Sequence, residues 1–188
     1  MTKIIKNATE AANIMKKGGV VIYPTESSYA LGCDATNAKA VKKVRKLKAR
    51  NPGKYFPVIV ADTNMAKRYY FVDKKIEKIA RLGITIITKK SKKLPKDIGG
   101  FRISKSTIAR KISKQLSKPV IATSANISGK ESMYGIDEIK KIFAGKVDAI
   151  LDAGNLPRKR PSTVYDYVNR KLLRKGPVTL GQIKKALK

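Results

Sequence analysis

Short apolar runs rich in Val and Ile alternate with lysine-flanked amphipathic stretches along the whole chain. The apolar runs have the length and composition of β-strands, and they cover residues 20–23, 57–61, 84–88, 101–103, 120–123, 147–151 and 163–168. Between them, apolar positions recur at helical spacing over residues 8–17, 37–49, 73–82, 105–117 and 136–144. Asn7 with Glu10, and Thr179 with Gln182, have capping-box spacing and mark the starts of the first and last helices.

This alternation of strands and helices predicts an α/β fold. The sequence contains no repeat with a period of 20–50 residues, so a solenoid is excluded. No Pro-, Gly- or Ser-rich linker divides the chain, and 188 residues suit one hydrophobic core. We therefore expect residues 1–188 to form a single domain.

The composition is strongly basic. Lys and Arg number 43 against 13 Asp and Glu, which gives a formal net charge of +30. Such a charge attracts polyanions, so one interpretation is a nucleic acid or a nucleotide-phosphate substrate. The other interpretation is a lysine-rich proteome or a salty cell interior, because 33 lysines are spread along the chain and outnumber 10 arginines. The charge alone does not decide between them.

The residues that are absent exclude several kinds of chemistry. With no histidine and one cysteine, the chain offers no Cys/His zinc site, no Ser-His or Cys-His catalysis and no internal disulfide. A lone cysteine also favours a reducing, cytoplasmic location. The N-terminus has no apolar signal-peptide region, and no apolar run reaches the ~18 residues of a membrane span, so we expect no membrane contact. The glycine motifs of P-loops and of dinucleotide-binding folds are both absent.

Four polar segments lie at the ends of predicted strands, where open α/β sheets place their ligand crevices. They are a hydroxyl cluster in 24–34, a basic cluster in 48–54, an uncharged stretch in 120–129, and residues 161–166 followed by 172–176. Cations at a helix end suit a polyphosphate, whereas small neutral donors suit a carboxylate, a carbonyl or a base edge. Each segment alone is equally typical of a polar turn, a solvated basic turn or a β-hairpin.

The order of these segments resembles that of the YrdC-like family, the threonylcarbamoyl-AMP synthases. The matching stretches are PTESSYALG (24–32), KARNPGK (48–54), FRIS (101–104), SANISG (124–129), STVYD (162–166) and LRKG (173–176). The resemblance covers nearly the whole chain and fits the short members, so we expect no further C-terminal domain. It implies a twisted, open mixed β-sheet flanked by helices, with a basic concave cavity.

The resemblance also implies an activity. Members of this family are nucleotidyltransferases that condense L-threonine, bicarbonate and ATP into threonylcarbamoyl-adenylate and release pyrophosphate. That product serves N6-threonylcarbamoylation of adenosine 37 in tRNA, through a downstream threonylcarbamoyl-transferase machinery. The implied partners are therefore these substrates, tRNA or double-stranded RNA, and the transferase, in the cytoplasm.

Two sets of binding residues follow from the resemblance, position by position. The ATP-binding set is Lys48, Arg50, Lys54, Asn126, Tyr134 and Arg174. The threonine-binding set is Thr25, Ser27, Arg102, Ser124 and Ser162. No residue is an evident nucleophile or base, so we expect catalysis by positioning, with Lys48 and Arg50 as electrostatic stabilisers. We expect no metal-ligating side chain, and Mg²⁺ bound through the ATP phosphates.

Several positions depart from the family pattern. Serine replaces threonine at Ser27, alanine replaces glycine at Ala30, and the family's R-I-P strand ends here in Ser104. A histidine common after the basic motif is missing near Ile59, and Arg81-Leu82-Gly83 replaces a P-G-P turn. One alternative is therefore a double-stranded RNA- or tRNA-binding module of the same fold with weak or lost catalysis. Another is a related carbamoyl-adenylating activity that uses carbamoyl phosphate.

Overall fold

The computed structural model describes residues 1–129 and 131–188. Its helices are α1 (Ala8–Lys16), α2 (Ala38–Leu47), α3 (Thr63–Tyr69), α4 (Lys74–Ala80), α5 (Thr107–Leu116), α6 (Ile136–Phe143) and α7 (Leu180–Leu187). Its strands are β1 (Lys3–Ile5), β2 (Val21–Pro24), β3 (Tyr29–Gly32), β4 (Phe56–Val60), β5 (Thr85–Ile87), β6 (Ile98–Ile103), β7 (Val120–Ile121), β8 (Thr123–Ser124), β9 (Ala149–Leu151), β10 (Val164–Asp166) and β11 (Lys171–Arg174).

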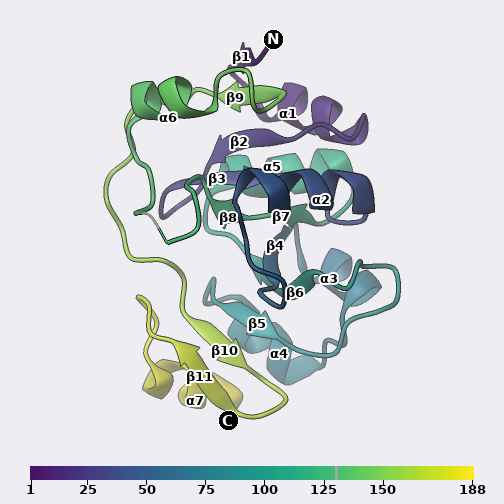
Figure 1. Ribbon diagram of the computed structural model, residues 1–188. Coiled ribbons are helices and arrows are strands. Elements are labelled where there is room, and N and C mark those ends of the chain that lie inside the picture. Colours follow the sequence, from purple (N-terminus) through teal and green to yellow (C-terminus); the bar gives the residue numbers. More distant parts are fainter. Residues whose placement is uncertain (130) are drawn as a thin grey trace.

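The strands form two mixed sheets, one above the other in Figure 1. The first sheet has the order β1-β9-β2-β3-β8, and its β1, β9 and β2 are parallel. The second has the order β11-β10-β5-β6-β4-β7, with β4 parallel to β6 and β10 parallel to β5. Helices α1 and α5 pack against each other; α1 covers β2 and β9 of the first sheet, and α5 contacts β2 of the first sheet and β4 of the second. Helices α4 and α7 pack together beside the second sheet.

Residues 120–124 pass directly from the second sheet to the first at Ala122. Before it, β7 pairs with β4 of the second sheet, and after it, β8 pairs with β3 of the first. The amide of Ile121 donates to Cys33 O (3.0 Å), and the Tyr23 hydroxyl donates to Ile121 O (2.7 Å). Gly32 lies so close to this crossing that a Cβ there would be 2.0 Å from Ile121 O. The crossing therefore fixes how the two sheets meet.

A second connection, residues 152–163, runs without regular structure from β9 to β10 along the left side of Figure 1. Its start is held by Tyr29, whose hydroxyl donates to Gly154 O (2.7 Å) and accepts the amide of Ala153 (3.0 Å). Its end carries Ser162, which contacts the second sheet through Thr85 (Oγ to Oγ1, 3.0 Å). The segment thus spans the junction between the sheets.

The predicted α/β class with mixed pairing is confirmed, and the capping residues act as predicted. Asn7 Oδ1 accepts the amide of Glu10 (3.0 Å), and Thr179 with Gln182 forms a complete capping box. The strands divide between two sheets rather than one, because the run predicted as a single strand over 120–123 changes sheets at Ala122. The pattern also missed β1, β3, β11 and α3.

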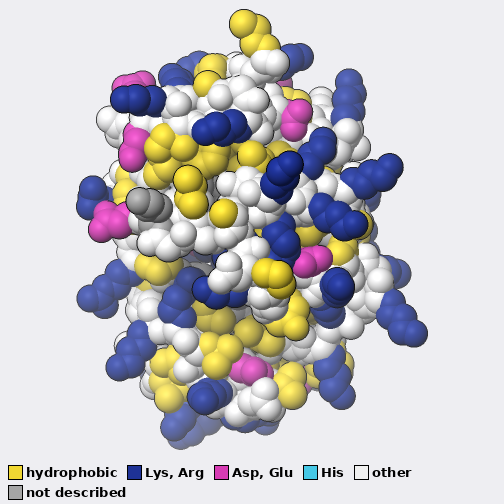
Figure 2. All heavy atoms as spheres, viewed as in Figure 1, with side chains coloured by type: hydrophobic (Ala, Val, Ile, Leu, Met, Phe, Trp, Pro, Cys, Tyr) yellow, Lys and Arg dark blue, Asp and Glu magenta, His cyan; other side chains and the backbone are white. Residues whose placement is uncertain are grey.

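On the face of the molecule shown in Figure 2, the basic side chains are spread out rather than gathered in one patch. In the face shown in Figure 2, Lys and Arg side chains project all around the outline and lie among apolar side chains within it. Helix α2 is an example of this distribution, because it buries Ala40, Val41 and Val44 and exposes its lysines to solvent. The helices together carry 18 of the 43 Lys and Arg residues, so their solvated faces account for part of the positive charge.

Candidate active site

A cavity of about 230 Å³ lies where the two sheets meet, and we call it the central cavity. It is lined by all five residues of the predicted threonine-binding set, and by Arg50 and Arg174 of the ATP-binding set. These side chains come from the β2–β3 turn, the loop after α2, β6, β8, residues 161–162 and β11, and they lie up to about 150 residues apart in the sequence. The fold therefore brings the separate motifs together.

The hydroxyl cluster after β2 is a tight turn. Thr25 Oγ1 donates to Ser28 O (2.7 Å) and accepts the amides of Ser27 (3.3 Å) and Ser28 (3.4 Å). The Thr25 hydroxyl therefore closes the turn by bonding to the nearby backbone, as Ser and Thr hydroxyls commonly do in turns. The Ser27 side chain, 3.4 Å from Thr25 Oγ1, lines the cavity with it.

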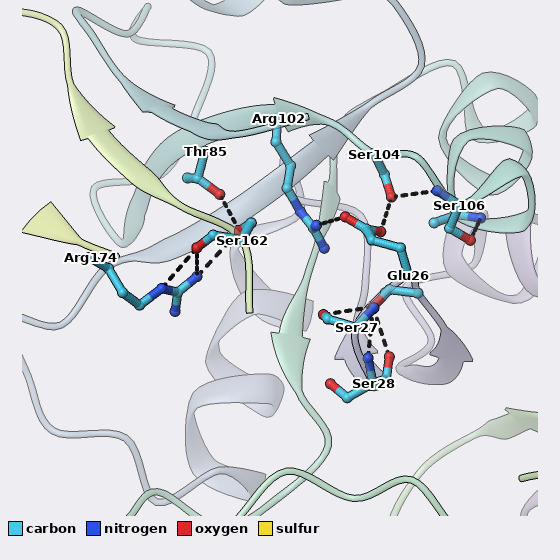
Figure 3. A network of polar contacts seen from close by, with 11 residues as sticks. Glu26, Ser27, Ser28, Thr85, Arg102, Ser104, Ser106, Ser162 and Arg174 are labelled. Atoms are coloured by element: carbon cyan, nitrogen blue, oxygen red, sulfur yellow. Dashed lines mark hydrogen bonds and ion pairs between the residues drawn. The ribbon is translucent and has the colours of Figure 1, made fainter. Parts of the chain in front are cut away.

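Arg102 projects from β6 into the junction and is 5% exposed. Its Nη1 donates to Glu26 Oε1 in an ion pair, and the Ser104 hydroxyl donates to Glu26 Oε2 (2.5 Å), as Figure 3 shows. A buried guanidinium needs such a partner because an unpaired charge is costly to remove from water. Glu26 carries no role in the sequence-based prediction, although its position inside the hydroxyl motif was the available signal.

Arg174 comes from β11 and holds the 161–163 segment. Its Nε and Nη2 donate to Ser162 O (3.0 and 2.7 Å), and Nη2 is 3.2 Å from Ser162 Oγ. Burial and the nearby Arg102 lower the pKa of the Arg174 guanidinium. Arg102 and Arg174 carry like charges and face the same cavity, which indicates an anionic ligand between them.

Arg50 and Arg174 also line a second cavity of about 570 Å³, which we call the basic cavity. Its other charged lining residues are Lys90 and Lys96, and no acidic residue among those described lines it. The loop that carries Arg50 is stabilised by Arg45, which donates to Asn51 O (2.9 Å) and forms an ion pair with Asp97 (2.6 Å). The guanidinium groups of Arg45 and Arg50 lie over the Phe56 ring, at 5.0 and 4.9 Å from its centroid respectively.

Lys48 lies under the 124–128 loop and is 3% exposed. Its Nζ donates to Ser124 O (2.6 Å), Asn126 O (3.0 Å) and Asn126 Oδ1 (2.5 Å). Its own carbonyl accepts the amide of Ser128 (2.9 Å). Burial, with a smaller contribution from Arg50, lowers the pKa of Lys48 to about 8. In this structure Lys48 holds the loop, so its predicted contact with a phosphate stays a prediction.

A third cavity of about 530 Å³ borders the 124–128 loop through Asn126 and Ile127, and we call it the Tyr134 cavity. Asn126 and Tyr134 of the predicted ATP-binding set line it, with Glu131, Glu138 and Arg158. The Arg158 guanidinium lies 5.5 Å from the Tyr134 ring centroid. This cavity and the central cavity share Ser132, so they are neighbours.

Lys54 of the predicted ATP-binding set is exposed and lies outside the lining of these three cavities. Within residues 1–129 and 131–188, no group of three or more Cys, Asp or Glu side chains could hold a metal ion. In the same part of the chain, no helix is long and apolar enough to cross a membrane.

The fold and these cavities define an α/β protein with cavities rich in cationic side chains where its two sheets meet. The Sua5/YciO/YrdC family model, described as telomere recombination, matches residues 13–176. The chain belongs to this family, as its motifs predicted.

Three relatives illustrate the similarity. A Methanocaldococcus jannaschii protein named "Putative threonylcarbamoyl-AMP synthase" is 36% identical over 176 residues, covering 88% of this chain and 84% of the relative. The structure of P. abyssi Sua5 complexed with L-threonine has a TM-score of 0.89 and 27% identity; it covers all of this chain, which spans 61% of that protein. E. coli YciO has a TM-score of 0.85 and 26% identity, covering 97% of this chain and all of YciO.

Proposed function

We propose that this protein is a threonylcarbamoyl-AMP synthase, which condenses L-threonine, bicarbonate and ATP into threonylcarbamoyl-adenylate and pyrophosphate. The observation that carries the proposal is the pair Arg50 and Arg174, which line both the small central cavity and the larger basic cavity. An amino acid in the first and a polyphosphate in the second would meet at these guanidinium groups. The names of the similar synthases, and the threonine complex of P. abyssi Sua5, support the same reaction.

The charges of the two larger cavities suggest how ATP lies. The basic cavity has four cationic side chains in its lining, whereas the Tyr134 cavity has two acidic ones and Arg158. A triphosphate is attracted to the former and repelled by carboxylates in the latter. We therefore place the β- and γ-phosphates toward the basic cavity, the adenosine toward Tyr134 and Asn126, and the α-phosphate beside the central cavity. Tyr134 offers an aromatic face to the base.

This arrangement supports a reaction by positioning. The threonine amine and bicarbonate form a carbamate and water, and a carbamate oxygen then attacks the α-phosphorus of ATP. The bond from the α-phosphorus to the bridging oxygen breaks, and pyrophosphate leaves with that electron pair. Arg50 and Arg174 would stabilise the negative charge that develops there, and Mg²⁺ would arrive on the phosphate oxygens as part of the substrate. Hydroxyls of Ser27, Ser124 and Ser162 would orient the amino acid.

The cellular role follows from the product. Threonylcarbamoyl-adenylate is a reactive mixed anhydride, so a transferase that modifies tRNA must consume it, and we propose a cytoplasmic location for both. The net charge of +30 would favour encounter with tRNA through long-range attraction. An RNA-binding module without catalysis is not favoured, because such a module needs no cavity in which the hydroxyls of Ser124 and Ser162 lie beside buried Arg102.

The test is pyrophosphate release from ATP, measured with and without L-threonine and bicarbonate. We expect release only when both are present. Arg174→Ala should reduce kcat/KM at least about a hundredfold, since removing one donor to developing charge costs that much in other enzymes. Arg110→Ala, an exposed arginine on α5, is the matched control and should retain activity. Pyrophosphate release at the same rate without threonine, or no release from folded protein, would contradict the proposed function.

The orientation of ATP is tested separately by binding of its two halves. Tyr134→Ala should weaken AMP binding several-fold and leave pyrophosphate binding unchanged. Lys96→Ala should weaken pyrophosphate binding several-fold and leave AMP binding unchanged. Isothermal titration calorimetry with each ligand measures both. The opposite pattern would mean that ATP lies in the reverse direction.

A further inference from the structure

The pairing of Arg102 has a consequence for ligand recognition. The Arg102 side chain is 6% exposed and lines the central cavity, so its charge must be balanced locally. Among the described residues, Glu26 is the one hydrogen-bonding partner of this guanidinium, through Nη1. The guanidinium has five N–H donors in a fixed plane, so Nε and Nη2 remain for a ligand.

Glu26 is itself held in place. Its second oxygen, Oε2, accepts the Ser104 hydroxyl, and Ser104 Oγ in turn accepts the amide of Ser106 (3.2 Å), the residue that caps α5. The carboxylate is therefore fixed at both oxygens, one by the guanidinium and one by the start of a helix. Figure 3 shows Arg102, Glu26 and Ser104 converging from β6 and the turn after β2. Glu26 does not itself line the central cavity.

We propose that Glu26, supported by Ser104, is a positioning residue that orients Arg102 to bind the α-carboxylate of the amino-acid substrate. This inference rests on the proposed function, since it assigns a role within the same site. Held at Nη1, the guanidinium presents a fixed edge to the cavity, so a planar carboxylate forms two parallel hydrogen bonds with it. A ligand without that carboxylate would leave buried N–H donors unpaired, which penalises its binding.

Charge and geometry predict opposite results when Glu26 loses its charge. If Glu26 only balanced charge, Glu26→Gln would remove a negative group near the ligand, and a carboxylate would bind more tightly. If Glu26 orients Arg102, the same substitution frees the guanidinium, and the carboxylate binds more weakly. The sign of the change therefore separates the two roles.

The experiment compares L-threonine with L-threoninol, which has a hydroxymethyl group in place of the carboxylate. Calorimetry gives the ratio of their dissociation constants in the unaltered protein and in Glu26→Gln, Ser104→Ala and Ser106→Ala. We expect the preference for threonine to fall about tenfold in Glu26→Gln and about threefold in Ser104→Ala, the size of one charge-assisted or one ordinary hydrogen bond. Ser106→Ala is the matched control, because it removes the cap of α5 without touching Glu26.

The outcomes are distinct. A reduced preference in Glu26→Gln and Ser104→Ala, with ATP affinity and the preference in Ser106→Ala unchanged, supports the inference. An unchanged or increased preference overturns it, and if Glu26→Gln does not fold, Ser104→Ala decides alone. Kinetics give a second readout, since a positioning role raises KM for threonine and leaves KM for ATP unchanged. If the unaltered protein binds no threonine, the proposed function itself fails. If it binds threonine and the preference is unchanged in Glu26→Gln, only the role of Glu26 fails.

Discussion

Replacing Lys48 with methionine tests whether this lysine holds the 124–128 loop or binds phosphate. Methionine is an unbranched side chain one atom shorter than lysine, and it removes all three N–H donors. Those donors reach Ser124 and Asn126, which line the central and the Tyr134 cavities respectively. A clamp should therefore affect both ligands, whereas a phosphate ligand should affect ATP alone.

The stability change should be small, because two effects nearly cancel. Three hydrogen bonds from a charged donor contribute about 4 kcal/mol at the low end of the usual range. Burial lowers the pKa of Lys48 from 10.5 to about 8, which costs about 3 kcal/mol at pH 7. The net loss in Lys48→Met is about 1 kcal/mol, or a fall in Tm of about 2–4 °C.

The assay combines thermal denaturation with calorimetric titration of L-threonine and of ATP. We expect Lys48→Met to weaken both ligands at least about tenfold while Tm changes by only a few degrees. Lys54→Met is the matched control, since this exposed lysine lies in the same motif, and it should leave Tm unchanged. If threonine affinity is retained and only ATP affinity falls, the clamp is refuted and Lys48 is a phosphate ligand, as the family resemblance implies.

Two further predictions concern stability. Because the folded pKa of Lys48 is about 8 and the unfolded value is 10.5, the unfolded chain binds more protons between these values and stability rises with pH there. The free energy of unfolding relative to Lys48→Met should increase by about 2 kcal/mol from pH 7.5 to 9.5 in urea denaturation; a decrease would contradict the assigned burial. Gly32→Ala should lower Tm by roughly 6–12 °C, because its Cβ would meet Ile121 O at 2.0 Å and overpacking costs about 3 kcal/mol. Gly181→Ala, with 3.8 Å to its nearest neighbour in α7, should not lower Tm, and equal losses in both variants would show that crowding at the sheet crossing is not the cause.

The sequence identified most of the fold because its strands are dense in Val and Ile. The exceptions have physical reasons. Strand β3, Tyr29–Gly32, is fully buried but contains no β-branched residue, and it lies within a motif that also suits a turn. Strand β1 is three residues long and has one buried side chain, so it is too short to show the alternation of apolar and polar residues that marks a strand. The change of sheet at Ala122 depends on which strands lie on either side, and no local pattern encodes that.

The candidate site divides in the same way. The order of the motifs identified the residues that line the central cavity, since each motif is local in the sequence. The contacts of Lys48 with Ser124, and of Arg102 with Glu26, join residues 76 positions apart. Whether a cation faces a ligand or another part of the protein is decided by such tertiary contacts. Lys48 and Lys54, neighbours in one motif, accordingly have opposite exposures.

The place of β9 between β1 and β2 affects how the chain folds during synthesis. Among the described residues, strand β1 pairs with β9 alone. The residues of β9, 149–151, are made last among the strands of the first sheet. At 5–20 residues per second, β1 waits about 7–30 s on the ribosome for its partner. Until then the buried edge of β2 has no neighbour on that side. A chain that ends before Ala149 would keep this edge open, so premature termination should yield an aggregation-prone fragment rather than a smaller folded protein.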